Sequence, residues 1–313
     1  MSNKRPYIPH VYSGNPLDRG ESQRRDEQWI SDRVRDPASK FLPLRDLNVL
    51  ISEGSENHLG WHSTGDLTRW GTETQAVFLG LLDGAAYFAI DISNNDRAVT
   101  ELQESVDFRF EDARAVTELL SGPDSGIVAQ ARQQLNWHSR NGYCSICGHE
   151  TSVRRGGQVR HCAGCNTGHF PRTDPVIITV VSNGDRCQLG QSRGRLSRTN
   201  MYSALAGFMD QGESIEEAVA REVMEEAGIR IENIRYHSSQ PWPFPSSLMI
   251  GCHADAVTTE IRMDSEEMAD VGWFQRDEVL LALEGKSDKL KVPAPLAIAH
   301  HLINAWATDT QGT

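Results

Sequence analysis

The sequence predicts an α+β protein with more than one domain, on the basis of length, composition and pattern. The chain has 313 residues, which corresponds to about two domains at roughly 100–200 residues each. Hydrophobic residues make up 38% and aromatic residues 7% of the chain, enough to build packed cores and to exclude wholesale disorder. After residue 173, strand and helix patterns are mixed without a regular strand–helix–strand repeat, which favours α+β over a doubly wound α/β sheet.

Charge and hydropathy exclude two further classes of protein. The chain carries 31 Lys and Arg against 43 Asp and Glu, a net charge of −12, which argues against a general nucleic-acid coat protein but leaves a local basic groove open. The longest apolar stretch, residues 76–90, is broken by Gly80, Asp83 and Gly84, whereas a membrane helix needs about 20 apolar residues. The N-terminus has basic residues without an apolar run behind them, so we expect no secretory signal, no membrane partner and a cytoplasmic location.

Changes in composition divide the chain into four segments. Residues 1–40 are polar and charged, and we expect a loose lead-in there. Residues 41–140 are expected to form an N-terminal α/β domain, in which no catalytic motif is visible. Residues 141–172 are dense in Cys, His, Gly and Arg, and residues 173–306 carry the mixed strand and helix patterns.

The clearest local signal in the N-terminal domain is a β-hairpin. Two apolar runs are separated by Asp83-Gly84, a dipeptide typical of two-residue hairpin turns. The expected strands are Gln75–Leu82 and Ala85–Ile92, and helical spacing follows at Glu111–Leu120 and Gly126–His138. In the C-terminal part we expect strands at Val176–Ser182, Cys187–Gln191, Ile234–Ser238, Leu248–Ala256 and Asp270–Phe274, then helices at Asp277–Leu283 and Ala294–Trp306.

Four of the six cysteines form two C-x-x-C pairs separated by fourteen residues: Cys144, Cys147, Cys162 and Cys165. Two intervening residues let both thiolates of a pair reach one ion from a tight turn. Two such pairs complete a tetrahedral Zn²⁺ site without an open position, which indicates a structural role for the metal. The alternative is two reduced, packed dithiols.

Three basic residues, Arg154, Arg155 and Arg160, lie between the two cysteine pairs. A solvated charged face is the usual explanation of such a group. A nucleic-acid contact is the sharper alternative, and we keep it as the minority interpretation.

A helix is predicted to begin at Ser214 and to end before Gly228. Ser214 followed by Glu217 forms a capping box, and Gly228 is placed to terminate the helix. At 100° per residue, one side collects small or apolar side chains, and we expect that side to face a core. These residues are Ala220, Val223, Met224 and Ala227.

Another side of this helix collects Glu222, Glu225 and Glu226 at i, i+3 and i+4 spacing. Carboxylates this close repel one another, and locally only Arg221 offsets the repulsion. The cluster makes sense if divalent cations lie among the carboxylates, and oxygen ligands select Mg²⁺ or Mn²⁺. Ala218, one turn earlier, leaves room for an ion and a phosphate. The alternative is an ordinary solvated acidic face.

The spacing of the whole stretch resembles the Nudix box at every defined position. Gly207 is followed after five residues by Glu213, and after seven more by the run Arg221-Glu222-Val223-x-Glu225-Glu226-x-Gly228-Ile229. The resemblance implies a Nudix hydrolase, with a mixed sheet between helices. Members cleave a nucleoside diphosphate linked to another moiety, using bound divalent metals and an attacking water.

The resemblance also implies roles for individual residues. Glu222 and Glu226 are the expected metal ligands, Glu225 shares the ions, and the carbonyl of Ala206 is a further ligand. Arg221 is expected to orient the glutamates through an ion pair, with Glu213 as a candidate partner.

Downstream of the helix lies a second signature, in which three prolines alternate with two aromatic residues. Alternating prolines fix an extended, rigid run, which holds two rings where a flat ligand could stack. Taken alone, the run could also be a connecting loop whose aromatics pack on their own domain. The run comprises Gln240, Pro241, Trp242, Pro243, Phe244, Pro245, Ser246 and Ser247, preceded by Ser239.

This run, beside a Nudix box, resembles the SQPWPFPxS array of the NADH pyrophosphatase subfamily. That subfamily also carries a four-cysteine zinc ribbon before the Nudix domain, which implies the ribbon at residues 141–172 and a subfamily-like N-terminal domain. Phe170 occupies the place of a family Tyr, which removes a hydroxyl but keeps the ring. Glu267 matches a further family metal-binding carboxylate, and Ile298-Ala299 matches a segment against the substrate, whereas Arg109 is a looser match to a substrate contact.

The implied reaction is hydrolysis of NADH or NAD⁺ to nicotinamide mononucleotide and AMP. The resemblance makes Phe208 and Trp242 candidates to sandwich the base, with Trp242 supplied by a second subunit of a homodimer. Stacking on one ring is worth about 1–3 kcal/mol by analogy with aromatic contacts to nucleobases. Glu225 and Glu267 are the candidates for the general base.

Two alternatives to hydrolysis of free NAD(H) remain at this point. The same chemistry could remove the NAD cap from RNA 5′ ends, since the reaction centre is identical. The chain could instead be an inactive zinc-ribbon binding or regulatory protein, although the box glutamates that inactive relatives usually lose are all present.

Overall fold

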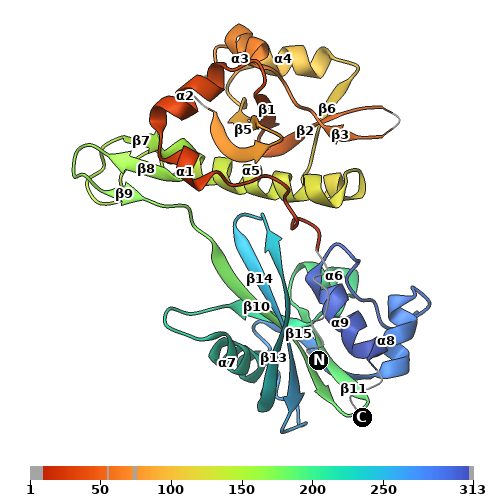
Figure 1. The fold of residues 1–313 in the computed structure, drawn as a ribbon. Helices are drawn as coiled ribbons and strands as arrows, with labels where there is room; N and C mark the ends of the chain where they lie inside the picture. The colour runs from red at the N-terminus through yellow and green to blue at the C-terminus, as the bar shows by residue number, and fades with distance from the viewer. Residues whose placement is uncertain (1–9, 55, 73–75, 310–313) are drawn as a thin grey trace, which may run out of the picture. The chain divides into compact units, whose positions relative to one another are not determined.

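A computed structural model describes residues 10–54, 56–72 and 76–309 (Figure 1). The chain forms two compact units. The first comprises Met1–Thr173 together with Trp242–Ser246, and the second comprises Asp174–Pro241 with Ser247–Thr313. The predicted boundaries of the ribbon and of the C-terminal domain, at residues 141–172 and 173–306, stay predictions.

The first unit is built around a mixed sheet with the strand order β3-β2-β1-β5-β4, and β6 pairs with β2. The strands are β1 (Lys40–Arg45), β2 (Asn48–Ser52), β3 (His58–Leu59), β4 (Val77–Leu82), β5 (Ala85–Asp91) and β6 (Phe108–Glu111). The helices beside them are α3 (Thr64–Trp70), α4 (Asp96–Glu104) and α5 (Gly122–Arg140). The sheet is mixed because β1 runs parallel to β5 and antiparallel to β2.

The predicted hairpin is confirmed as β4 and β5. Asp83 and Gly84 have φ values of 50° and 80°, the left-handed conformations that a two-residue hairpin turn requires. The predicted start of the first strand, Gln75, lies outside the described residues. The helix predicted at Gly126–His138 is confirmed within α5.

The helix predicted at Glu111–Leu120 is wrong. Glu111 pairs with β2 as the end of β6, and Ser121 caps α5, so the segment between them holds only the 3₁₀ helix η2 (Ala115–Glu118). Because Glu111 is taken up by the strand and Ser121 by the cap of α5, the residues between them can form only a single helical turn.

The loose lead-in is also a wrong prediction for the described residues up to 39. It contains α1 (Glu21–Arg24) and α2 (Glu27–Arg35), and the apolar side chains of α2 pack on the core of the first unit. Arg24 is only 1% exposed and donates to the carbonyl oxygens of Arg19, Leu79 and Gly156. High charge suggested a loose chain, but a buried guanidinium that bonds three carbonyls fixes the lead-in to the sheet.

The cysteine-rich segment also lies in the first unit and forms an antiparallel sheet with the order β7-β8-β9. Its strands are β7 (Thr151–Arg154), β8 (Val159–Cys162) and β9 (Gly168–His169), with a 3₁₀ turn, η3 (Arg155–Gly157), between the first two. One C-x-x-C turn precedes β7, and the other connects β8 to β9.

The second unit contains a mixed sheet with the order β13-β14-β10-β11-β15, and β12 pairs with β10. The strands are β10 (Asp174–Asn183), β11 (Arg186–Ser192), β12 (Leu205–Phe208), β13 (Ile231–Trp242), β14 (Ser247–Ala256) and β15 (Met268–Gln275). The helices are α6 (Arg195–Thr199), α7 (Ile215–Ala227), α8 (Arg276–Leu283) and α9 (Ile298–Thr308). Every strand predicted in this part of the chain is confirmed, with ends that differ by a few residues.

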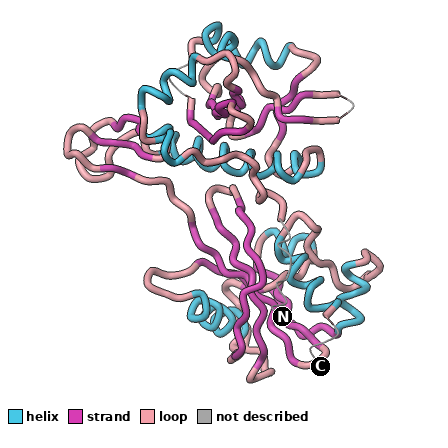
Figure 2. Tube along the Cα trace, viewed as in Figure 1, coloured by secondary structure: helices cyan, strands magenta, loops and turns pink. Residues whose placement is uncertain are grey.

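Apolar side chains of β10 point alternately to the two faces of this sheet, which explains why helices cover both faces. Ile177 and Val181 face the core clusters that contain α7, while Ile178 and Val180 face the cluster of α8 and α9. Figures 1 and 2 show α7 on one side of the strands and α8 with α9 on the other. The predicted mixed sheet between helices is confirmed.

Two ends in the second unit differ from prediction for reasons of proline geometry. α9 begins at Ile298 and not at Ala294, because a residue before proline, here Pro295, avoids helical backbone. β13 extends to Trp242 through Pro241, which is tolerated because β13 is the edge strand of its sheet. Within the described ranges, none of the helices combines the length and apolarity needed to cross a bilayer.

Candidate active site

The helix that carries the acidic cluster, α7, has both ends fixed as predicted. Ser214 Oγ accepts from the backbone N–H of Glu217 at 3.2 Å, and the Glu217 carboxylate accepts from the backbone N–H of Ser214 at 2.7 Å. At the other end, Gly228 has φ 68° and its N–H donates to the carbonyl of Met224. The capping box and the terminal glycine therefore set the 13 residues of the helix.

The predicted core face of α7 is partly wrong. Ala220 and Met224 are exposed, whereas the fully buried residues are Ala218, Val219, Val223 and Ala227. Relative to the prediction, the helix is rotated about its axis, so that its buried side also includes two of the acidic residues. Helical periodicity gives the direction of each side chain around the axis, but it could not tell which of these directions faces the core.

Glu222 and Glu226 are accordingly buried, at 8% and 7% exposure, while Glu225 is exposed. Burial, with the neighbouring carboxylates of Glu222 and Glu267, raises the pKa of Glu226 to about 8. Its Oε2 atom has no hydrogen-bond partner among the residues that the structure describes. A buried, unpaired carboxylate oxygen is costly, and a cation would satisfy it.

Gly207, on β12, leaves the space that the carboxyl group of Glu222 occupies. A Cβ atom at position 207 would overlap the carboxyl group of Glu222. β12 also supplies Ala206, whose backbone N–H donates to Glu226. The first glycine of the Nudix-like pattern is therefore required by close approach of a carboxylate to the backbone.

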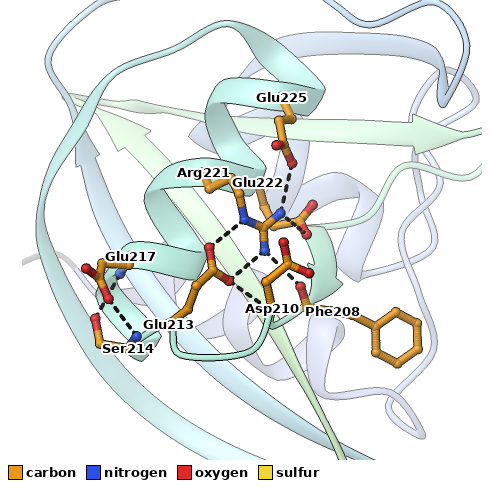
Figure 3. A network of polar contacts seen from close by, with 8 residues as sticks. All are labelled: Phe208, Asp210, Glu213, Ser214, Glu217, Arg221, Glu222 and Glu225. Atoms are coloured by element: carbon orange, nitrogen blue, oxygen red, sulfur yellow. Dashed lines mark hydrogen bonds and ion pairs between the residues drawn. The ribbon is translucent and has the colours of Figure 1, made fainter.

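Arg221 joins the acidic residues into one network (Figure 3). Its Nε and Nη2 atoms donate to the two carboxylate oxygens of Glu213 at 2.6 and 2.8 Å. Its Nη1 atom donates to Glu222 and to Glu225, both at 2.8 Å, and Nη2 also donates to the carbonyl of Phe208. The bidentate contact lowers the pKa of Glu213 to about 2. The network fixes Glu222 and Glu225 relative to the start of the helix.

The distances between the sulfur atoms of the four cysteines suit a bound zinc ion. Their sulfur atoms all lie within 4.8 Å of one another, with 3.6 Å between Cys144 and Cys165 and 3.4 Å between Cys147 and Cys162. Tetrahedral Zn–S bonds of about 2.3 Å place sulfur atoms roughly 3.8 Å apart. His169 Nε2 lies 3.2 Å from Cys144 Sγ, where it can support one thiolate.

The aromatic signature is divided between the units. Gln240 is buried in the second unit, where its side chain donates to the carbonyl of Leu296 and accepts from the N–H of Ile298, each at 2.8 Å. Trp242–Ser246 belong to the first unit, in which Trp242 and Phe244 pack against Tyr12. Pro243, Ser246 and Ser247 are buried and Pro245 is exposed.

Two family models match the chain. One, the NADH pyrophosphatase-like rudimentary NUDIX domain, matches residues 38–137, and the NUDIX domain matches residues 171–294. The NAD-capped RNA hydrolase NUDT12 of Macaca fascicularis is 35% identical over 98% of this chain and 75% of its own length. The chain belongs to the Nudix hydrolase family, in the NADH pyrophosphatase subfamily.

Two other relatives of this Nudix hydrolase carry related names. The mitochondrial NAD(P)H pyrophosphatase NUDT13 of Mus musculus is 38% identical over 85% of this chain and 83% of its own length. The NAD-capped RNA hydrolase NudC of Mycobacterium bovis is 37% identical over 74% of this chain and 75% of its own.

The structure brings together Ala206, Arg221, Glu222, Glu225 and Glu226 in the second unit of this Nudix hydrolase, and Glu267 acts electrostatically on both buried glutamates. Nudix hydrolases need a divalent metal, and the unpaired oxygen of Glu226 fits one. The individual roles of these residues stay predictions.

The remaining predicted substrate contacts are distributed over both units. Phe208 in the second unit and Phe170 in the first are 61% and 66% exposed, as rings available to a ligand would be. Ala299, in the first turn of α9, is 3% exposed and belongs to the core of the second unit. Arg109 forms ion pairs with Glu53 and Glu111 in the first unit. Substrate contact by each of the four stays a prediction.

The basic residues of the ribbon are mostly engaged within the first unit. Arg155 pairs with Glu21, and its backbone N–H donates to Glu27. Arg160 donates to the hydroxyl and the carbonyl of Thr151. These contacts favour a structural use of two of the three arginines over a nucleic-acid contact.

Sequence reasoning missed the residues that surround Phe244, namely Tyr12, Arg114 and Arg132. They come from a polar lead-in, a short 3₁₀ segment and a helix, none of which carries a recognisable motif. Only the tertiary fold gathers them.

Proposed function

We propose that this Nudix hydrolase cleaves the diphosphate bond of NADH and NAD⁺, giving nicotinamide mononucleotide and AMP. The observation that carries the proposal is the buried pair Glu222 and Glu226 on α7, with an unpaired oxygen on Glu226. Such a pair is electrostatically unfavourable by itself and suits the binding of divalent cations. The names of two relatives, an NAD(P)H pyrophosphatase and an NAD-capped RNA hydrolase, support the substrate class.

Mg²⁺ or Mn²⁺ is the proposed catalytic metal, since the donor set is oxygen. Glu222, Glu226, Glu225 and Glu267 with the carbonyl of Ala206 would hold it. When bound, the metal polarises phosphoryl oxygens and lowers the pKa of the attacking water.

The residues of the chain then have separate tasks in the hydrolysis. Arg221 keeps Glu222 and Glu225 oriented through the contacts described above. Glu225 or Glu267, both exposed, accepts the proton of the water that attacks phosphorus. The bond between that phosphorus and the bridging oxygen breaks, and the second mononucleotide departs with the bridging oxygen on its phosphate group. Phe208 and Trp242 are proposed to stack on the base, in a homodimer in which the second subunit supplies Trp242.

Zn²⁺ is the proposed occupant of the four-cysteine site, in a structural role. All four corners of the tetrahedron are filled by thiolates, so no position is left for substrate or water.

Removal of the NAD cap from RNA is the second candidate function, because several relatives, among them NUDT12 and NudC, are named NAD-capped RNA hydrolases. The engagement of Arg155 and Arg160 within the first unit favours the free dinucleotide. Rates on free NADH and on NAD-capped RNA, measured side by side, discriminate the two.

The deciding experiment is incubation of the purified chain with Mg²⁺ or Mn²⁺ and NADH, followed by identification of the products. Nicotinamide mononucleotide and AMP are expected from the wild type and not from Glu226→Gln. Glu216→Gln, an exposed glutamate on the same helix, is the matched control. Absence of hydrolysis of both NADH and NAD-capped RNA would favour the inactive binding protein.

A further inference from the structure

Phe244, the second aromatic residue of the signature, is held between two arginine side chains of the first unit. The guanidinium carbon of Arg114 lies 3.7 Å from the centre of the Phe244 ring, and that of Arg132 lies 4.9 Å from it. Both distances are within the range of cation–π attraction. Phe244 also packs against the apolar core of the first unit. Its ring therefore has neighbours on the protein side that a stacking ligand would have to replace.

Arg132 binds the backbone of the signature as well as its ring. Its Nε atom donates to the carbonyl of Pro243 at 2.9 Å, and its Nη1 atom donates to the carbonyl of Leu47. Burial of the guanidinium lowers the pKa of Arg132. A partly buried arginine with two carbonyl acceptors has little freedom, so it fixes the position of Pro243 relative to the sheet of the first unit.

Tyr12 extends this site to the neighbouring ring, Trp242. Tyr12 is 1% exposed, and its hydroxyl donates to the carbonyl of Ala113 at 2.7 Å. Its ring meets Trp242 edge to face, at 6.1 Å between centroids and 82° between planes, and meets Phe244 at 5.9 Å and 70°. Trp242 and Phe244 are themselves 5.4 Å apart. The orientation of Trp242 thus depends on two rings that are held by the first unit.

We infer that Phe244 is an anchor and that Arg114, Arg132 and Tyr12 are positioning residues that hold Trp242 ready for the substrate base. We call Tyr12, Arg114, Arg132 and Phe244 the aromatic clamp. The inference gives the N-terminal domain, in which no catalytic motif is visible, a task in substrate recognition. It rests on the proposed function in one respect, namely that Trp242 contacts the dinucleotide.

Arg114 is the residue to change, because it is exposed and its removal leaves the core intact. Arg114→Ala is expected to raise KM for NADH about fivefold or more and to leave kcat within twofold, since the clamp acts on binding and not on the metal cluster. Arg33→Ala is the matched control, because Arg33 makes a cation–π contact with Trp29 at 5.3 Å in the same unit. Its KM should equal that of the wild type.

Fluorescence reports the position of Trp242 without any turnover. The emission of Trp242 is obtained by subtracting the spectrum of the Trp242→Phe counterpart from that of each protein, in the wild-type, Arg114→Ala and Arg33→Ala backgrounds. We expect this difference spectrum to shift to the red and to become more accessible to acrylamide in Arg114→Ala, and to stay unchanged in Arg33→Ala. An unchanged Trp242 spectrum in Arg114→Ala would overturn the inference.

A double-mutant comparison tests whether Arg114 acts through Phe244. If it does, Phe244→Ala and the double variant Arg114→Ala/Phe244→Ala should have the same KM, while Phe244→Tyr, which keeps the ring, should resemble the wild type. Effects of the two single changes that multiply in the double variant would contradict the clamp.

The outcomes also separate this inference from the proposed function. A wild type that does not hydrolyse NADH refutes the proposed function, while the fluorescence arm still decides whether the clamp holds Trp242. A wild type that hydrolyses NADH, with Arg114→Ala equal to Arg33→Ala in both KM and fluorescence, refutes the clamp alone.

Discussion

The carboxyl group of Glu222 occupies the space that a side chain at Gly207 would need. This relationship joins β12 to α7 and places one of the two buried acids directly against the backbone. It explains a glycine that no turn or positive φ requires.

Gly207→Ala should displace Glu222 and thereby disturb the metal site. We expect at least a hundredfold loss of metal-dependent hydrolysis and a destabilisation of about 1–3 kcal/mol, as for other overpacked sites. Steady-state kinetics and urea unfolding measure the two effects. Gly122→Ala, at a glycine with open space around its Cβ position, is the control and should change neither. Full activity of Gly207→Ala would show that Glu222 need not lie where it does.

Without divalent metal, the stability of the second unit should fall as pH rises from about 4.5 to about 8. The pKa of Glu226 is raised to about 8 in the folded chain, so the folded state binds more protons than the unfolded state between these values. Glu226→Gln should remove this dependence and increase stability at pH 8 by about 2–5 kcal/mol, since one pKa unit corresponds to about 1.4 kcal/mol. Thermal unfolding at several pH values, with chelator present, measures the difference. A wild type whose stability rises over this range would contradict the burial of the Glu226 carboxylate with one unpaired oxygen.

Added Mg²⁺ or Mn²⁺ should stabilise the wild type at pH 8 far more than it stabilises Glu226→Gln. Binding to the folded state alone raises stability with the logarithm of the metal concentration, and the variant lacks one charged ligand. Metal titrations followed by thermal unfolding test this. Equal shifts in both proteins would place the metal elsewhere.

Arg221→Lys should lose most of the activity despite keeping the charge. The guanidinium contacts Glu213 with two nitrogen atoms and reaches Glu222, Glu225 and a carbonyl at the same time, which an ammonium group cannot reproduce. We expect a decrease in kcat of roughly 10²-fold, in line with the loss of orientation at a catalytic site. Arg230→Lys, at an exposed arginine just beyond the helix, is the control. A kcat close to wild type in Arg221→Lys would reduce Arg221 to a simple counter-charge.

Removal of zinc should loosen the first unit and leave the chemistry of α7 intact. Cys147→Ser is expected to lose the metal, measured as zinc per chain, and to become more sensitive to proteolysis within residues 141–172, because a structural zinc site contributes directly to folding. Cys187→Ala, at a buried cysteine outside the cluster, should retain the metal. Retention of zinc by Cys147→Ser would argue against a site built from all four cysteines.

The features that the sequence determined by itself are those encoded within a few residues. The capping box at Ser214, the i, i+4 spacing of Glu222 and Glu226 and the two C-x-x-C pairs are local, because each depends on helical or turn geometry alone. The hairpin at Asp83-Gly84 belongs to the same class. These patterns sufficed to predict the bounds of α7, the acidic cluster, the group of four cysteines and the hairpin.

Tertiary structure decided what local geometry leaves open. Periodicity could not choose which side of α7 is buried, because that depends on the free energy of packing against β10 and β12, and the chosen side includes two acids. The charged lead-in gave no sign that Tyr12 and Arg24 would be buried, nor that Phe244 would lie among side chains more than 100 positions away. Contacts between residues so distant in sequence form only when the whole chain folds, since no local pattern specifies their partners.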